Sequence, residues 1–340
     1  MNGDANRCAN CTLPINFPGI SFNENGICNL CDDFNLDDHR ASQNAAKTQL
    51  YETIQYSKNI STAVGAPYDA IVALSGGKDS CFTLKYLVQE HGLRCFAITV
   101  DNGFLSDQSV KNSRQLCESL GVDFVLWKPN TKFMNSLYVS SLDSINRNRG
   151  AIVRASDLCN NCINLINSLM LKEAVIRNVP MIAGGYIAGQ VPRGTCVMKL
   201  KLETLLKFSA IKNSTGNSMF SLRHYQITET DLENYTAGDA VHILNPMLSL
   251  NYNEEDIIAS LEKFEWKRSP DTGSHSSNCR INDLGIKVHL KKYGFHPYEQ
   301  EIAEQVRSGN LTREKALKKI MANLDEERIA AVESQVRMYE

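Results

Sequence analysis

The stretch that decides the fold is residues 71–82, IVALSGGKDSCF, in which a short apolar run ends in a polar, glycine-containing loop. The apolar run predicts a buried β-strand, and the amphipathic pattern of residues 80–92 predicts the helix that follows it. Two adjacent glycines let a backbone approach a ligand closely, and the free N–H groups at the start of a helix favour an anion. The loop consists of Ser75, Gly76, Gly77, Lys78, Asp79 and Ser80. We therefore predict that it binds phosphate, with Lys78 supplying positive charge and Asp79 orienting a neighbouring donor or helping to hold Mg²⁺.

Further strand patterns follow this loop, each separated from the last by a helical pattern. They lie at residues 94–101, 123–129 and 180–186. Strands that alternate with helices predict βαβ units, so we expect an α/β fold with a doubly wound parallel sheet. Ligands of such sheets bind at the carboxyl ends of the strands. Residues 101–103 and 184–190 lie at strand ends too, so we expect them, Gly184 included, near the phosphate loop.

The chain divides into regions of different character. We predict a zinc-ribbon-like module at residues 1–36, a helical connector at 37–65, a parallel-sheet domain at 66–200 and a mostly helical region at 201–340. The last region matches no motif, and we expect it to shape the substrate pocket and to end in two helices capped by Thr312 and Asp325.

The composition excludes few classes of protein. Of the 340 residues, 43% are hydrophobic and 22% are charged, and the net charge is −2. No stretch approaches the roughly 20 apolar residues of a membrane helix, and the N-terminus lacks the pattern of a signal peptide. We therefore expect a cytoplasmic protein that does not associate with membranes. The near-neutral charge mildly favours a small-molecule substrate over RNA without excluding RNA.

Eleven cysteines are many for a cytosolic protein, and several of them are paired. Cys8-x₂-Cys11 and Cys28-x₂-Cys31 form two CxxC pairs that are sixteen residues apart. Four thiolates in this spacing suit tetrahedral zinc, and such a closed site stabilises a fold rather than catalysing a reaction. We predict structural zinc here.

A third pair, Cys159 and Cys162, stands at the start of a predicted helix. At positions i and i+3 the two sulfur atoms share one face, and a helix N-terminus favours the thiolate. A cluster needs a third ligand, for which Cys279 in a polar loop is the first candidate and Cys196 the second. The thiols could hold an iron–sulfur cluster or a persulfide, form a second zinc site, or be purely structural. We expect Cys81, Cys95 and Cys117, which lie in apolar patterns, to be core residues.

The sequence SGGKDS at the end of the first strand resembles the signature of the PP-loop ATP pyrophosphatases, and the resemblance covers about residues 65–190. It implies that ATP binds with its pyrophosphate on residues 75–80 and its adenine near Val100 and Asp101. It also implies that the enzyme adenylates a carbonyl oxygen of its substrate and releases pyrophosphate, with Lys78 and Asp79 taking part. A nucleophile, ammonia or a sulfur species, then displaces AMP.

Two subgroups of that superfamily are similar to other parts of the chain. The layout CANCTLPINFPGISFNENGICNLC, the CxxC pair in the middle of the chain and the late stretch SGNLTREKAL resemble N-acetyl sugar amidotransferases. A similar zinc module precedes the PP-loop in some tRNA thiouridine synthases. Two cysteines with a distant third also resemble the three-cysteine [4Fe-4S] site of certain thiouridine synthases.

Three functions therefore compete. The first is adenylation followed by thiolation of a nucleobase or small molecule, with a sulfur-donor protein or sulfide as partner. The second is amidation with ammonia from a separate glutaminase subunit. The third is a non-catalytic nucleotide-binding regulator, which Lys78 and Asp79 argue against, since mere binding needs less. The expected cofactors are ATP, Mg²⁺, Zn²⁺ and, for thiolation, a [4Fe-4S] cluster. The sequence does not decide the oligomeric state, and a homodimer is one candidate.

Overall fold

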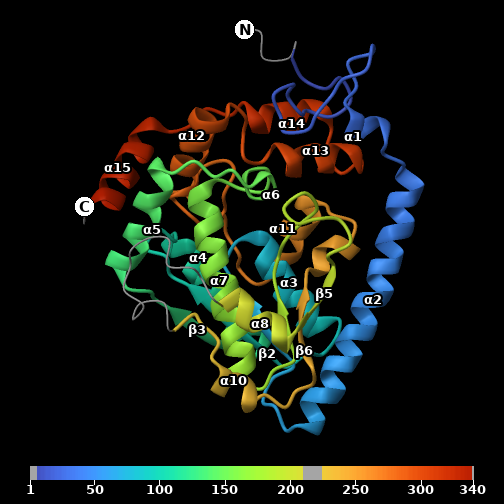
Figure 1. Cartoon of the computed structure of the whole chain (residues 1–340), viewed down its shortest axis with the longest axis vertical. Coiled ribbons are helices and arrows are strands. Elements are labelled where there is room, and N and C mark those ends of the chain that lie inside the picture. The colour runs from blue at the N-terminus through green and yellow to red at the C-terminus, as the bar shows by residue number, and fades with distance from the viewer. Residues whose placement is uncertain (1–5, 210–223, 339–340) are drawn as a thin grey trace.

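The computed structural model describes residues 6–209 and 224–338, and its centre is a six-stranded sheet in the order β3-β2-β1-β4-β6-β5 (Figure 1). The strands are β1 (Ala70–Ala73), β2 (Cys95–Val100), β3 (Asp123–Trp127), β4 (Met181–Ala183), β5 (Val197–Lys201) and β6 (Ala240–Leu244). All neighbouring strands are parallel except β5, which pairs antiparallel with β6 at the edge. The predicted α/β class is confirmed.

The chain reverses its direction of winding at β1. It first builds β2 and β3 on one side, through the crossover helices α3 (Lys78–Gln89) and α4 (Asp107–Leu120). After α5 (Thr131–Asp143), α6 (Arg149–Ile152) and α7 (Asp157–Ile176) it returns to the other side of β1 as β4. The carboxyl ends of β1 and β4 thus flank a topological switch point, which is where open α/β sheets bind ligands.

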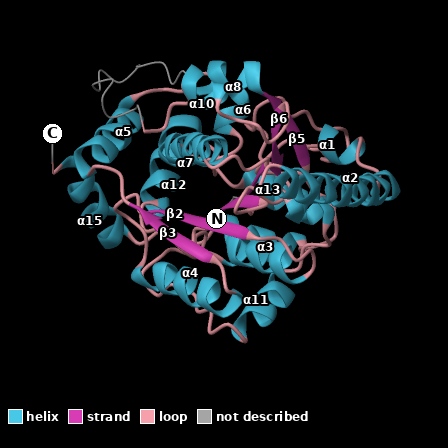
Figure 2. Ribbon diagram, turned by 90° about the horizontal axis from the view of Figure 1, so that it is seen from below, coloured by secondary structure: helices cyan, strands magenta, loops and turns pink. Residues whose placement is uncertain are grey.

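Helices cover both faces of the sheet, as Figure 2 shows. Successive side chains of a strand point to opposite faces. In β1, Ile71 accordingly packs into the apolar cluster that contains α7, while Ala70 and Val72 pack into the cluster that contains α3. This double burial explains why β1 reads as a continuous apolar run.

The remaining helices surround these two layers. They are α1 (Asn29–Asp32), α2 (Leu36–Ala63), α8 (Leu202–Ser209), α10 (Glu229–Glu233), η1 (Pro246–Ser249), α11 (Glu254–Glu262), α12 (Asn282–Tyr293), α13 (Glu299–Arg307), α14 (Arg313–Ile320) and α15 (Glu326–Arg337). The predicted caps are confirmed, because the side chains of Thr312 and Asp325 accept hydrogen bonds from the first turns of α14 and α15. Within the described residues, no helix combines the length and the apolar character needed to cross a membrane.

One strand lies where the sequence predicted a mostly helical region. Strand β6 pairs with β4 in register Met181↔His242, so the parallel sheet continues past residue 200, where we had placed the end of the sheet domain. The run AVHIL at residues 240–244 is short and apolar, and such a run fits a buried strand and a buried helical turn equally well. Pairing with β4 decides between them.

The N-terminal module is docked on the body of the protein rather than loosely appended to it. It lies beside α13 and α14 at one end of the molecule, while α2 runs along one side (Figure 1). The rings of Phe17 and Phe295 meet edge to face at 5.1 Å, and Asn16 donates a hydrogen bond to the carbonyl oxygen of Gly294. The two ends of the chain therefore share one small apolar cluster.

Candidate functional site

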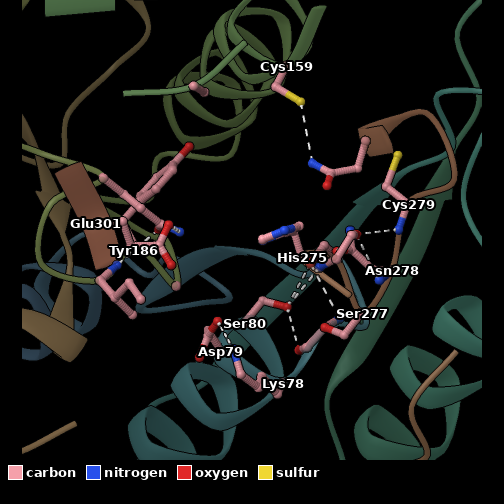
Figure 3. Close-up of a pocket in the computed structure, with 18 of the residues that line it drawn as sticks. Lys78, Asp79, Ser80, Cys159, Tyr186, His275, Ser277, Asn278, Cys279 and Glu301 are labelled. Atoms are coloured by element: carbon pink, nitrogen blue, oxygen red, sulfur yellow. Dashed lines mark hydrogen bonds and ion pairs between the residues drawn. The ribbon is translucent and has the colours of Figure 1, made fainter. Parts of the chain in front are cut away.

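A cavity of about 380 Å³ opens at the switch point between β1 and β4. Segments that are far apart in the sequence line it: the loop after β1, the end of β2, the start of α7, the loop after β4, residues 274–282 and part of α13. Figure 3 shows Lys78, Asp79 and Ser80 on one side of this space and Cys159 on the opposite side. The convergence of strand ends that the sequence predicted is therefore present.

The loop after β1 is held in one shape by its own hydroxyls and by its neighbours. The hydroxyls of Ser75 and Ser80 lie 3.0 Å apart, and the Ser80 hydroxyl also donates to the carbonyl oxygen of Gly77. The carbonyl oxygen of Gly76 accepts hydrogen bonds from the side chains of Asn112 and Trp266. This pinning leaves the backbone N–H groups at the start of α3 beside the cavity, where an anion would be stabilised.

Lys78 supplies the positive charge of the loop. Its ammonium lies 2.8 Å from the carboxylate of Asp79 and 4.0 Å from that of Glu254. Burial alone would lower the pKa of Lys78, but the negative charges of Asp79 and Glu254 outweigh burial and raise that pKa well above its ordinary value. Lys78 is thus a cation at every physiological pH, held between two carboxylates that are suitable oxygen ligands for Mg²⁺.

Two glycines of the loop after β4 allow it to pack tightly between the phosphate loop and α13. A Cβ on Gly185 would lie 2.7 Å from the backbone nitrogen of Ser80, and one on Gly189 would lie 2.5 Å from the Cα of Glu301. The predicted residue Gly184 lines the cavity at the start of this loop. These close approaches set the spacing between the phosphate loop and α13.

The two residues at the end of β2 that we expected near the adenine lie differently. Val100 lines the cavity. Asp101 does not line it, because its carboxylate pairs with Lys128 at 2.9 Å and accepts a hydrogen bond from the backbone of Gly103. The next residue, Asn102, faces the cavity in its place.

The third CxxC pair and Cys279 line the same cavity as the phosphate loop. Ser156 caps α7 by accepting a hydrogen bond from the backbone nitrogen of Cys159, which places Cys159 and Cys162 in the first turns of the helix. Cys279 comes from a loop that pairs with the segment after β2 through the bridge Leu105↔Cys279. The sequence thus predicted a trio whose three members do line one cavity.

The other candidate for the third thiol lies elsewhere. Cys196 is buried in the apolar cluster on the α3 side of the sheet and does not line the cavity. The residues that we expected to be core cysteines are buried in that same cluster; they are Cys81, Cys95 and Cys117.

One electrostatic expectation is wrong. We expected the helix N-terminus to lower the pKa of Cys159 and thereby favour the thiolate. Burial instead raises the pKa of the Cys159 and Cys162 thiols, and it raises the pKa of Cys279 to about 12. The thiols therefore need hydrogen-bond donors or a bound cation before they carry negative charge.

The part of the cavity wall that α13 provides escaped the sequence analysis. Glu301 on α13 accepts a hydrogen bond from Gln190 at 2.9 Å, and burial raises its pKa to about 7. Tyr186 lies beside Glu301 (Figure 3). No sequence motif marks α13, whereas Asn102 and Tyr186 belong to the strand-end segments 101–103 and 184–190 that the sequence placed near the loop after β1.

The four cysteines of the N-terminal module form a separate buried cluster. Their sulfur atoms all lie within 4.8 Å of one another, and the Cys8–Cys31 and Cys11–Cys28 sulfur pairs are each 3.8 Å apart. Zinc–thiolate bonds of about 2.3 Å in a tetrahedron place the sulfurs about 3.8 Å apart, so this donor set fits zinc. Within the described residues, no second group of three or more potential ligands meets so closely.

The fold and the site define a doubly wound α/β protein with a cavity and a glycine-containing strand–loop–helix at its switch point. No protein-family model matches the chain. An uncharacterized protein of Methanocaldococcus jannaschii is 24% identical over 256 residues, which cover 75% of this chain and 73% of that protein.

Solved structures are similar in fold at 13–14% identity. They include an NH3-dependent NAD synthetase from Campylobacter jejuni (TM-score 0.34, covering 86% of this chain and 94% of that one) and an NMN synthetase from Francisella tularensis (0.39, 89% and 97%). A third is the U34-tRNA thiolase NcsA from Methanococcus maripaludis with its [4Fe-4S] cluster (0.35, 94% and 90%). All belong to the PP-loop ATPase superfamily that residues 75–80 resemble. The likeness is remote, so the function proposed below rests on this chain's own residues.

Proposed function

We propose that the protein is an ATP-dependent enzyme that adenylates a carbonyl oxygen of its substrate and then replaces that oxygen by sulfur. The observation that carries the proposal is that Cys159, Cys162 and Cys279 line the same cavity as the phosphate loop. A thiolation needs an anion-binding loop for the phosphates on one side of the substrate and groups that carry sulfur on the other side. Nucleotide binding alone needs only the loop.

The reaction balances in two steps. In the first, the substrate carbonyl oxygen bonds to the α-phosphorus of ATP while the bond to the β-phosphate oxygen breaks, and pyrophosphate leaves on the side of Lys78. In the second, sulfur bonds to the activated carbon while the carbon–oxygen bond breaks, and AMP leaves. The loop at residues 75–80 stabilises the charge that develops on the departing phosphates. Such preorganised donors contribute a large share of many enzymes' rate enhancement.

Two sources of sulfur are compatible with these three cysteines. Hydrosulfide, or sulfide held on a cluster, transfers without a change in oxidation state. A persulfide on one cysteine transfers its outer sulfur when a second cysteine attacks the inner one. That route leaves a disulfide, which an external thiol must reduce. The sulfur atoms of Cys159, Cys162 and Cys279 do not all lie within 4.8 Å of one another. A group larger than a single ion, such as a [4Fe-4S] cluster, therefore fits them better than a second zinc ion.

The test begins with protein purified without oxygen. Broad visible absorption with iron and acid-labile sulfide supports a cluster. If the protein contains zinc alone and no labile sulfide, the cluster version is excluded and the persulfide route remains. If ammonia then supports turnover, the protein is an amidotransferase instead. Pyrophosphate release is then measured with ATP and, in turn, an unmodified tRNA transcript and a nucleotide-linked N-acetylhexosamine.

Variants separate the two steps. Lys78→Ala should lower pyrophosphate release by about 100-fold or more, the cost of losing one preorganised donor in other enzymes. Cys159→Ser and Cys279→Ser should abolish sulfur incorporation while ATP still binds. Sulfur transfer that survives both cysteine changes would show that the proposed role of the trio is wrong.

A further inference from the structure

The residue that connects two of the three sulfur atoms is Asn102, at the end of β2. It is only 6% exposed. Its side-chain oxygen accepts a hydrogen bond from the backbone nitrogen of Phe104 at 2.9 Å, and this bond fixes which end of the amide faces the cavity. The amide nitrogen lies 3.6 Å from the sulfur of Cys162 and 3.5 Å from that of Cys279.

The chemistry of this contact matches charged sulfur. A side-chain amide nitrogen carries two hydrogens and no lone pair for accepting, and here the nitrogen lies within hydrogen-bonding distance of two sulfur atoms. A thiolate or a metal-bound thiolate accepts such bonds strongly, whereas a neutral thiol is a weak acceptor. One nitrogen that donates to two sulfurs also limits how far apart those sulfurs can lie. It thereby joins a sulfur from α7 to one from a loop more than 100 residues later in the chain.

The same pattern occurs at the remaining member of the trio. The amide of Asn282 faces the sulfur of Cys159 at 3.9 Å and also donates to the hydroxyl of Tyr298. A Cβ on Gly285, one turn along α12, would lie 3.8 Å from that sulfur and 2.6 Å from the Ser156 hydroxyl, so the backbone of α12 approaches Cys159 closely. Each of the three sulfurs is therefore served by a buried asparagine amide.

We propose that Asn102 is a positioning residue that holds the sulfur atoms of Cys162 and Cys279 side by side at the cavity, where they can carry sulfur or bind a cluster. The proposal rests on the sulfur transfer proposed above and goes beyond it, because it assigns the pairing of these two cysteines to one amide. Asn102 acts through the cysteines and need not touch the substrate.

The decisive variant is Asn102→Asp. A carboxylate keeps the oxygen that accepts from the Phe104 backbone and has nearly the same shape, but it has no hydrogen to donate to either sulfur. Asn102→Leu removes the donors without adding charge. Asn135→Leu is the matched control, since Asn135 is also buried, at 4% exposure, and its amide bonds to the Gln335 carbonyl oxygen away from the cavity.

The first readout does not depend on activity. Protein freed of iron is treated with iodoacetamide at one pH, and mass spectrometry follows the alkylation of each cysteine. Both Asn102 variants should slow alkylation of Cys162 and Cys279 about threefold or more, because less thiolate forms and its higher nucleophilicity compensates only in part. Cys159, which Asn282 serves, should react at the wild-type rate. Asn135→Leu should match the wild type at all three cysteines.

The second readout is iron uptake from ferrous iron and sulfide without oxygen, in the same variants. If the wild type takes up iron, Asn102→Asp should retain at most half as much. If the wild type takes up none, the cluster version of the proposed function fails, and the alkylation rates still decide the role of Asn102. Equal alkylation of Cys162 and Cys279 in the wild type and Asn102→Asp would overturn the proposal. Should Asn102→Leu fail to fold, Asn102→Asp alone gives the answer.

Discussion

At the scale of single residues, the phosphate loop depends on a glycine that no other residue replaces. Gly76 has a φ of +75°, which L side chains rarely adopt, and a Cβ there would lie 1.9 Å from the carbonyl oxygen of Ser109. That oxygen belongs to the backbone of α4, so it cannot move aside cheaply. The sequence suggested close approach to a ligand, and the structure adds close approach to a helix.

Gly76→Ala should therefore cost more than the loss of glycine's backbone freedom. We expect the free energy of unfolding to fall by about 3 kcal/mol or more, from φ strain and overpacking together, with weaker ATP binding. Gly121→Ala is the control, since Gly121 has a φ of +64° but no atom within 4 Å of the added Cβ. Its cost should be about 1–2 kcal/mol. Urea unfolding of both variants checks this, and equal losses would contradict it.

At the scale of elements, α13 connects the four-cysteine cluster to the cavity. On one face Arg307 donates to the sulfur of Cys11 at 3.7 Å and forms a buried ion pair with Glu304. On another, Glu299 pairs with Arg7 of the N-terminal module at 2.8 Å. Glu301 and Gln305 of the same helix line the cavity. The N-terminal module therefore sets the position of one cavity wall.

Loss of the metal that we propose at the four cysteines should loosen α13. Chelation or Cys11→Ser should speed hydrogen exchange of backbone amides in residues 299–307 about tenfold or more and weaken ATP binding, because a structural zinc site contributes folding free energy. Cys95→Ser, a core cysteine in β2, serves as the control and should leave exchange in α13 much less affected. Faster exchange confined to residues 6–33 would show that the module and α13 are not coupled.

At the scale of the whole molecule, buried ionisable groups give the stability two opposing dependences on pH. Burial raises the pKa of Glu301 from 4.5 to about 7, so between these values the folded protein holds a proton that the unfolded chain has released. That group's contribution to stability falls as pH rises through this window. Burial lowers the pKa of His275 and His289 from 6.5 to about 4, and their contribution rises with pH over that range.

Replacing Glu301 isolates its contribution to the pH dependence of stability. Besides Gln190, the charged side chains of Lys78, Asp79 and Lys319 act on Glu301. From pH 4.5 to about pH 8, Glu301→Gln should gain about 2–3 kcal/mol of stability relative to the wild type, since one pKa unit is worth about 1.4 kcal/mol. Unfolding in urea at both pH values measures the difference. The exposed control Glu326→Gln should change by less than about 0.5 kcal/mol. A Glu301→Gln difference that does not grow with pH would contradict the assignment.

The sequence predicted most of what local pattern controls. Hydrophobic periodicity and cap chemistry act between residues that are close in the chain. They predicted the strand–loop–helix at residues 71–89, the parallel sheet and the capped helices at the C-terminal end. The sequence missed β6, whose identity depends on pairing with β4. It also placed the adenine near Val100 and Asp101, and that position stays a prediction; the structure shows that Asp101 pairs with Lys128.

By itself, then, the sequence determined the α/β class, the strand–loop–helix at residues 71–89, the four-cysteine cluster and the three cysteines that line the cavity, because each depends on residue type and spacing. Only the tertiary structure decided that Cys162 and Cys279 share the amide of Asn102, that Glu301 enters the cavity and that α13 joins the cavity to the N-terminal module. These contacts join residues 60 or more positions apart or lie on a helix without a motif. They are set by how the layers pack, which local pattern does not encode.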